Sequence, residues 1–301
     1  MGKPIKQVSL IGLGALGIMY SEHLSKKMPY EDLRIIADKE RINRYTKEGV
    51  FCNEERCNFN YVTPEQKVEP ADLLIFAVKY TQLQEAIKLV VNHVGKDTII
   101  LSVLNGIVSE SDIGAVYGND HNLYCVAQGM TAVKTDNRLI YMNKGILCYG
   151  ELNESENSEK VLRVKSFFDS IGMPYEINNQ MKTKLWSKLM ANVGINQTIA
   201  YHETTNSQIQ QSGPIRDIMI TAMEEVIKVA TLEEVDLSYQ DIDYWLRIFN
   251  TLEPEGMPSM AQDVKANRTT EVELFAGTIV KLAHKHGVDV PVNEMFYEYF
   301  R

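Results

Sequence analysis

Four polar side chains recur at intervals of four residues in an otherwise apolar stretch near the middle of the chain. They are Lys184, Lys188, Asn192 and Asn196. At this spacing they stack along one face of an α-helix, and the apolar neighbours predict that this helix is buried on most sides. One interpretation is that these four side chains form the solvent-exposed face of the helix. The two amides, in place of the usual mixture of Glu and Lys, favour a stripe that lines a cleft.

A lysine in a cleft could act as the general acid in the reduction of a carbonyl group. Negative charge grows on the oxygen as hydride adds to the carbon, and an ammonium group within hydrogen-bonding distance stabilises that charge and supplies the proton. Partial desolvation would lower the pKa of the lysine into a useful range. Lys188 lies deeper in the helix than Lys184 and nearer the asparagines, so we expect Lys188 to be the acid.

A second pattern with chemical potential is a GxGxxG motif that ends an apolar run near the N-terminus. Gly12 would allow a tight turn, Gly14 would let the backbone approach a pyrophosphate, and Gly17 would let the next helix pack closely. That helix would present free N–H groups to the phosphates. The residues predicted to bind a dinucleotide here are Gly12, Leu13, Gly14, Ala15, Leu16 and Gly17.

The next apolar run, residues 33–37, ends in Asp38. A nucleotide-binding fold places the residue that reads the adenosine ribose at this point. A carboxylate accepts a hydrogen bond from the ribose 2′-OH and repels a 2′-phosphate, so Asp38 favours NAD(H). Lys39 and Arg41 are close enough to bind a phosphate if Asp38 points away.

The segments that must position these residues change in character along the chain. The first half alternates strand-like and helix-like segments, which implies a parallel sheet with crossover helices. Residues 138–142 and 145–150 are predicted to form a hairpin, so that this sheet closes with an antiparallel edge. Later segments are predicted to be helical, at residues 181–200, 215–234, 239–251 and 259–286. We therefore expect an α/β fold, with a doubly wound Rossmann-type, dinucleotide-binding domain over residues 1–178 and an all-helical C-terminal substrate and catalytic domain over residues 179–301.

The last predicted helix contains two capping-box patterns. The first begins at Ser259, which is expected to cap the helix, and the second begins at Thr270. The second box predicts a break near Asn267 and a new helix from Thr270. With that bend, Ser259 and Glu271 could converge on one ligand. Without it, about 18 Å of straight helix would separate them.

Composition excludes several classes of protein. The chain has 301 residues, enough for about two domains, and its formal charge of -9 argues against a nucleic-acid partner. Its four cysteines are too few for a disulfide scaffold, and Cys52 and Cys57 lack the partners of a zinc site. The apolar runs are too short to span a membrane, and no room is left for a signal peptide. We expect a cytoplasmic protein without a metal.

Taken together, these motifs resemble the ketopantoate reductase (2-dehydropantoate 2-reductase) family over essentially the whole chain. The resemblance depends on residues 12–17, 78–79, 104–106, 185–196, 259–263 and 270–271. It implies NADPH-dependent reduction of 2-dehydropantoate to D-pantoate, the reductive step before pantothenate and coenzyme A. The cofactor is thus NADP(H) by resemblance or NAD(H) by Asp38.

The resemblance also implies roles for individual residues. Lys188 would be the general acid, with Glu271 beside it to orient the lysine and the substrate. Lys79 would lie near the cofactor, and Asn105 near both the nicotinamide and the substrate. The other substrate contacts would be Asn192, Asn196, Asn206 and Ser259.

Three departures from the family pattern leave alternatives open. Asp38 stands where members that prefer NADPH usually carry arginine, residues 255–258 replace a polar loop, and Gln197 replaces a proline. A relative that acts as an NADH-dependent D-2-hydroxyacid dehydrogenase on bulky 2-keto acids fits these departures. A nucleotide-binding regulator without turnover is a third option, which the pair of Lys188 and Glu271 argues against. The expected partner is a small-molecule 2-keto acid, and the oligomeric state is left open, with a homodimer as one option.

Overall fold

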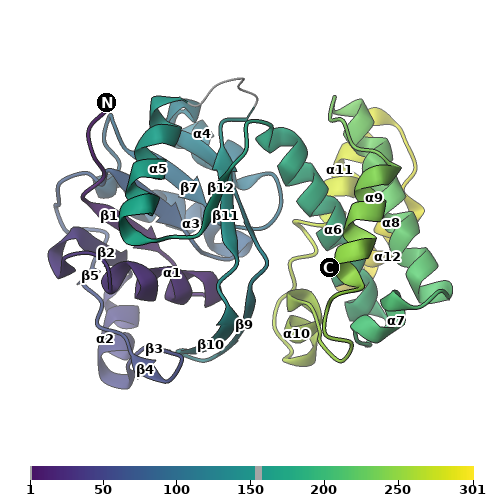
Figure 1. The fold of residues 1–301 in the computed structure, drawn as a ribbon, viewed down its shortest axis with the longest axis horizontal. Coiled ribbons are helices and arrows are strands. Elements are labelled where there is room, and N and C mark those ends of the chain that lie inside the picture. The colour runs from purple at the N-terminus through teal and green to yellow at the C-terminus, as the bar shows by residue number, and fades with distance from the viewer. Residues whose placement is uncertain (1, 153–157) are drawn as a thin grey trace. The chain divides into compact units, whose positions relative to one another are not determined.

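The computed structural model describes residues 2–152 and 158–301 of the chain. It divides into two compact units, Met1–Met181 and Lys182–Arg301 (Figure 1). The first unit contains the strands and the second is built from helices.

The described part of the first unit contains a sheet of eight strands in the order β12-β11-β8-β7-β6-β1-β2-β5. Its parallel centre is made of short, buried and mostly apolar strands, as is typical of parallel sheets. The strands are β1 (Val8–Ile11), β2 (Leu33–Ile36), β5 (Tyr61–Val62), β6 (Leu73–Phe76), β7 (Ile99–Ser102), β8 (Asn122–Gln128), β11 (Ile146–Gly150) and β12 (Tyr175–Ile177).

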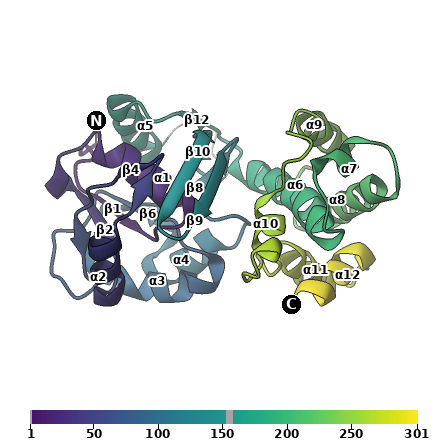
Figure 2. The same ribbon diagram turned by 90° about the horizontal axis from the view of Figure 1, so that it is seen from below.

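Helices cover both faces of this sheet, which confirms the doubly wound fold (Figures 1 and 2). Alternate strand residues point to opposite sides, so Leu10 packs in one core and Ile11 in the other. The first core includes α1 (Ala15–Ser25) and α5 (Glu159–Ile171), and the second includes α3 (Leu83–Leu89) and α4 (Ser109–Tyr117). Helix α2 (Lys39–Glu48) follows β2.

A smaller sheet in the same unit corrects the predicted hairpin. Its strands are β4 (Glu55–Arg56), β3 (Phe51–Cys52), β10 (Arg138–Asn143) and β9 (Thr131–Thr135), in that order. Strand β10 pairs antiparallel with β9, not with β11. The turn lies at Asp136, whose φ of 50° suits a two-residue hairpin loop.

Strand β11 belongs to the large sheet instead, where it pairs antiparallel with β8. The predicted antiparallel strand is therefore confirmed, but it is not the edge, because β12 pairs in parallel on its outer side. Gly145, at φ 65°, lets the chain pass from one sheet to the other, and a Cβ there would lie 2.1 Å from the Gln128 carbonyl oxygen. Only glycine fits that approach.

No strand occurs among the described residues of the second unit (Figure 2). The long helix α6 (Met181–Tyr201) packs against α8 (Pro214–Leu232), where Gly194 leaves room for Met223. The carboxylate of Glu225 on α8 accepts hydrogen bonds from the backbone N–H groups of Val292 and Asn293, both 2.9 Å, at the start of α12 (Pro291–Phe300). The other helices are α7 (Asn206–Gln210), α9 (Tyr239–Phe249), α10 (Ser259–Lys265) and α11 (Ala276–His286).

The predicted helix over residues 259–286 is in fact two helices. The break near Asn267 is confirmed, since this residue has a φ of 50°. The second helix begins at Ala276 and not at Thr270, because Phe275 has a non-helical backbone. The buried Gln197 side chain accepts a hydrogen bond from the Ala276 N–H (2.9 Å), which fixes the start of α11.

The predicted cap at Ser259 is also wrong. Pro258 occupies the N-cap position of α10, and Ser259 is already helical. The Gln262 amide donates to the Met257 carbonyl oxygen (2.9 Å), so the reciprocal bonds of a capping box do not form. This frees the Ser259 hydroxyl for another partner. Among the described residues, no helix is long and apolar enough to cross a membrane.

Candidate active site

The glycine-rich turn between β1 and α1 has the geometry that a dinucleotide requires. Gly12 has a φ of 100°, and a Cβ there would lie 2.6 Å from the Ala77 carbonyl oxygen. A Cβ on Gly17 would lie 1.9 Å from the Gly12 carbonyl oxygen. At Gly14, in contrast, the nearest atom to an added Cβ is 3.5 Å away, so this position is open on the ligand side. The turn thus fits a pyrophosphate held against backbone.

The first turn of α1 adds electrostatic complementarity to this geometry. Gly14 is the N-cap and supplies no side-chain acceptor, and the first turn has no acidic residue. The first N–H groups of the helix therefore keep their capacity to bind an anion, and the helix dipole favours negative charge at this end.

Three other predicted cofactor residues follow neighbouring strands of the sheet. Asp38 follows β2, Lys79 comes after β6, and Asn105 comes after β7. The sheet order β7-β6-β1-β2 is parallel, so the carboxyl ends of these strands lie at one edge. Ligands of open α/β sheets bind at that edge.

Asp38 has a structural role in addition to any ligand contact. One carboxylate oxygen accepts a hydrogen bond from the Arg41 N–H (2.7 Å) and caps α2, and the other lies 3.4 Å from the Arg41 guanidinium. The Asp38 side chain is still 43% exposed. Its negative charge is therefore partly compensated but open to solvent.

In the second unit, the polar stripe of α6 is not a solvated face. Lys184 and Lys188 are half-buried, and Asn192 and Asn196 are buried. Burial and, to a smaller extent, the like charge of Lys184 together lower the pKa of Lys188 to about 8. The lysine can thus carry a proton at neutral pH and release it at modest cost.

The asparagines form a directed chain of hydrogen bonds. Asn196 Oδ1 accepts from the Ser259 hydroxyl (3.2 Å) and from the Met260 N–H (3.3 Å). Asn196 Nδ2 must then donate, and it does so to Asn192 Oδ1 (3.3 Å). Asn192 Nδ2 is left buried with no partner among the described residues. A buried unpaired donor costs about 1–3 kcal/mol, which a ligand acceptor would recover.

Asn206 and Glu271 lie in other parts of this unit. The Asn206 backbone N–H donates to the Gly256 carbonyl (3.1 Å) and its side-chain Nδ2 to the Glu253 carbonyl (2.9 Å), so Asn206 holds the loop before α10. Its Oδ1 is buried without a partner in the described part of the chain. Glu271 is half-buried in the segment between α10 and α11.

Two family models match this chain. The model described as ketopantoate reductase PanE/ApbA covers residues 8–154, and the model of its C-terminal part covers residues 180–301. The chain belongs to the ketopantoate reductase family.

Individual relatives of this family member are distant but match over almost their full length. A 2-dehydropantoate 2-reductase of Aquifex aeolicus is 24% identical over 290 residues, which is 95% of this chain and 93% of the relative. A dimeric ketopantoate reductase of Staphylococcus aureus shares the fold with a TM-score of 0.81 at 21% identity, covering 98% and 97% of the two chains. A D-mandelate dehydrogenase, solved with NADH and anilino(oxo)acetate, has a TM-score of 0.85 at 20% identity, covering 97% and 96%. Such proteins transfer hydride with a nicotinamide dinucleotide.

Sequence reasoning misses the roles of two residues of the second unit, Trp245 and Gln197. Trp245 on α9 donates a hydrogen bond to the Ser187 hydroxyl (2.9 Å), and the Lys188 ammonium nitrogen lies 5.4 Å from the centre of its ring. In the sequence, Trp245 is simply an apolar position of an amphipathic helix. Gln197, seen only as a departure from the family pattern, proves to be the residue that fixes the start of α11.

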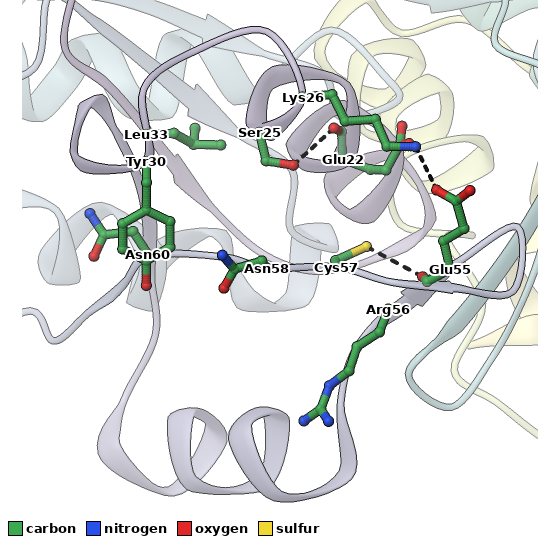
Figure 3. A pocket seen from close by; sticks show the side chains of 10 residues that line it. All are labelled: Glu22, Ser25, Lys26, Tyr30, Leu33, Glu55, Arg56, Cys57, Asn58 and Asn60. Carbon is green, nitrogen blue, oxygen red and sulfur yellow. Dashed lines mark hydrogen bonds and ion pairs between the residues drawn. The ribbon is translucent and has the colours of Figure 1, made fainter.

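A pocket of about 280 Å³ lies at the other end of α1 from the glycine-rich turn (Figure 3). Lys26 is paired there with Glu22 and Glu55, at 2.6 and 2.7 Å. Burial raises the pKa of the Cys57 thiol in its wall to about 12, so this thiol is not a nucleophile at neutral pH. We assign no part of the reaction to this pocket.

Proposed function

We propose that this protein reduces the ketone of 2-dehydropantoate to D-pantoate with a reduced nicotinamide dinucleotide. The observation that carries the proposal is the stripe on α6, where a half-buried lysine with a pKa of about 8 precedes two buried asparagines on the same helix face. The reaction needs both units of the chain, because the glycine-rich turn belongs to the first and Lys188 to the second.

The side chains of this stripe supply the proton and the orientation. A bound reduced nicotinamide supplies the hydride that adds to the ketone carbon. Lys188 stabilises the oxygen on which charge develops and transfers its proton to that oxygen, which completes the hydroxyl group. The neutral amine then regains a proton from solvent. Its lowered pKa keeps both of these transfers close to balanced at neutral pH.

The remaining residues are proposed to bind and orient. Asn192 offers a donor and Asn206 an acceptor to the polar groups of the substrate, since each has a buried atom without a partner in the described residues. Asn196 and Ser259 hold Asn192 in register and complete the substrate contacts. Glu271 orients Lys188, while Lys79 and Asn105 contact the cofactor and Asn105 also contacts the substrate. The pyrophosphate is held by residues 12–17.

For the cofactor we propose NADH, on the basis of Asp38. Its carboxylate lies at the end of β2, where the ribose is read, and Arg41 is tied to it. The test is Asp38→Asn, which keeps an oxygen to cap α2 but removes the charge. We expect the ratio of kcat/KM for NADPH over NADH to rise roughly tenfold, and Asp38→Arg to raise it further. An unchanged ratio in both variants would mean that Asp38 does not read the ribose.

A second candidate is an NADH-dependent D-2-hydroxyacid dehydrogenase that acts on bulky 2-keto acids. The same Asp38 carboxylate favours it, together with residues 255–258, which stand in place of a polar loop. Asn206 donates its backbone N–H to Gly256 of this segment and its side-chain Nδ2 to Glu253 just before it. Few side-chain donors would then be available for the 4-hydroxyl group of pantoate. Rates with branched and aromatic 2-keto acids, measured beside 2-dehydropantoate, separate the two candidates.

The central test follows nicotinamide absorbance with the purified full chain, each cofactor and this panel of keto acids. Absence of turnover with every pair would refute both enzyme proposals. Lys188→Ala should lower kcat at least roughly a hundredfold. Lys182→Ala, on the same helix, is the matched control and should retain activity.

We also propose a homodimer as the assembly in solution. The support is the likeness to the Staphylococcus aureus protein, which is described as dimeric. Light scattering should then give about twice the chain mass of 34.2 kDa, and a mass equal to one chain would reject the dimer.

A further inference from the structure

The indole ring of Trp245 lies against two successive residues of α6, Ser187 and Lys188. Its Nε1 donates a hydrogen bond to the Ser187 hydroxyl at 2.9 Å, and the face of the ring lies 5.4 Å from the Lys188 ammonium nitrogen. The ring is buried. It also stacks on Phe249, one turn later on α9, with ring centres 6.0 Å apart and an angle of 28°. The indole is therefore fixed from two sides.

We propose that Trp245 is a positioning residue, which holds the ammonium group of Lys188 against its ring face and keeps it charged and aimed for proton transfer. This inference rests on the proposed function, because it assigns a task to a residue that acts through Lys188.

Two effects disfavour the charged form of Lys188. Desolvation disfavours the ammonium form, and so does the positive charge of Lys184, one turn earlier on α6. From α9, the group that faces Lys188 is the neutral indole of Trp245. From the segment between α10 and α11, the Glu271 carboxylate, proposed to orient Lys188, would also favour the ammonium form, and this contribution is the same in wild type and in Trp245→Leu. The negative face of an indole attracts a cation, and tryptophan does this best among aromatic residues. The ring thus opposes the two other effects and limits the fall of the lysine pKa.

The contact also restricts the geometry of a long, flexible side chain. A lysine loses much rotamer freedom when it is held in one place, and a catalytic group must be held within a fraction of an ångström of its working position. The ring packs against the methylene groups of the lysine and attracts its ammonium group electrostatically. A leucine at position 245 would keep the apolar packing but would lose the attraction for the ammonium group.

The first test needs no turnover, so it is independent of the proposed reaction. The chain has two tryptophans, Trp186 and Trp245. In Trp186→Phe, we expect the emission of Trp245 to titrate with a midpoint near the Lys188 pKa of about 8. Adding Lys188→Met should abolish this titration. If the emission of Trp245 depends on pH in the same way with and without the Lys188 side chain, the proposal is overturned. If Trp186→Phe does not fold, the difference between wild type and Lys188→Met gives the same reading.

The second test is the pH dependence of kcat/KM, whose alkaline limb reports the loss of the Lys188 proton. Trp245→Leu should move this limb to lower pH by about half a pH unit, because the attraction of the ring for the ammonium group is lost. The loss of rate should fall on kcat more than on KM. Phe249→Leu is the control, since it loosens packing beside the indole but leaves the ring face, and it should not move the limb.

An unchanged or higher midpoint in Trp245→Leu would overturn the proposal, since a ring that only excluded water would raise the lysine pKa when removed. If no keto acid is turned over but the emission of Trp245 follows Lys188, then the proposed reaction fails and the contact stands.

Discussion

Replacing Lys188 by methionine should stabilise the second unit while it removes the proposed acid. Burial holds the pKa of Lys188 near 8, against an ordinary value of 10.5. A lysine whose folded pKa is lowered costs stability wherever it is charged in both states, and that cost is fully present below pH 8 or so. It disappears as the pH rises through the unfolded value. Methionine has a similar stem and no charge, so the variant does not bear this cost.

The size of the effect follows from the gap between the two pKa values. At about 1.4 kcal/mol per pH unit, the gap corresponds to about 3 kcal/mol at neutral pH. This is an upper value, because the half-buried side chain keeps some contact with water. Between about pH 7 and about pH 9.5, up to about 2 kcal/mol of the advantage of the variant should be lost.

The assay is urea unfolding at these two pH values, followed by tryptophan fluorescence. Both tryptophans belong to the second unit, so the signal reports the part of the chain that holds Lys188. Lys182→Met is the matched control on the same helix, and its difference from wild type should be equal at both pH values. If the difference between Lys188→Met and wild type is also independent of pH, the reasoning about desolvation is refuted.

Three further outcomes are expected. Gly17→Ala should destabilise the first unit in urea unfolding, because its Cβ would meet the Gly12 carbonyl at 1.9 Å, whereas Gly14→Ala should leave stability nearly unchanged and weaken cofactor binding in a fluorescence titration. The buried carboxyl of Glu110 accepts a hydrogen bond from Ser109, and burial raises its pKa to about 7. The protonated carboxyl of Glu110 therefore contributes to the free energy of unfolding at acid pH, and this contribution is lost as the pH rises through 7. In Glu110→Gln, the free energy of unfolding should vary less with pH between about pH 4.5 and about pH 8. Glu225→Ala should cost about 3 kcal/mol in urea unfolding, since it removes the carboxylate that receives the N–H groups at the start of α12. A loss under about 1 kcal/mol would contradict that assignment.

The features that the sequence predicts well are those set by neighbours along the chain. The glycine-rich turn is an example in part, because Gly17 meets the Gly12 carbonyl within one strand–turn–helix unit, whereas the close neighbour of Gly12 is the remote Ala77. The burial of α6 follows in the same way from the apolar residues around Lys188. The roles of the site residues remain predictions, since they concern ligands and reaction.

Most of the features that the sequence misses depend on segments far apart in the chain. The parallel pairing of β10 with β3 is one such feature, and it leaves β11 to pair with β8 in the other sheet. The pairing of β10 with β9 is local, through the two-residue loop at Asp136, and is missed for another reason, because the predicted turn lies on the other side of β10. The Ser-x-x-Gln pattern at Ser259 is a sound local signal, but Pro258 takes the cap position. The partner of the Ser259 hydroxyl is Asn196, 63 residues away. The contact between Lys188 and Trp245 is equally remote in sequence.

The direction of the amide chain on α6 has a consequence for selectivity. Because the Met260 N–H group can only donate, Asn196 and then Asn192 have no freedom to exchange their oxygen and nitrogen atoms. The free end of the chain is therefore always an N–H, and a ligand that meets it must bring a lone pair. A 2-keto acid satisfies this condition, whereas the ammonium group of the corresponding 2-amino acid would meet a second donor. If Asn192 contacts the substrate as proposed, the site would in this way discriminate against the corresponding 2-amino acid.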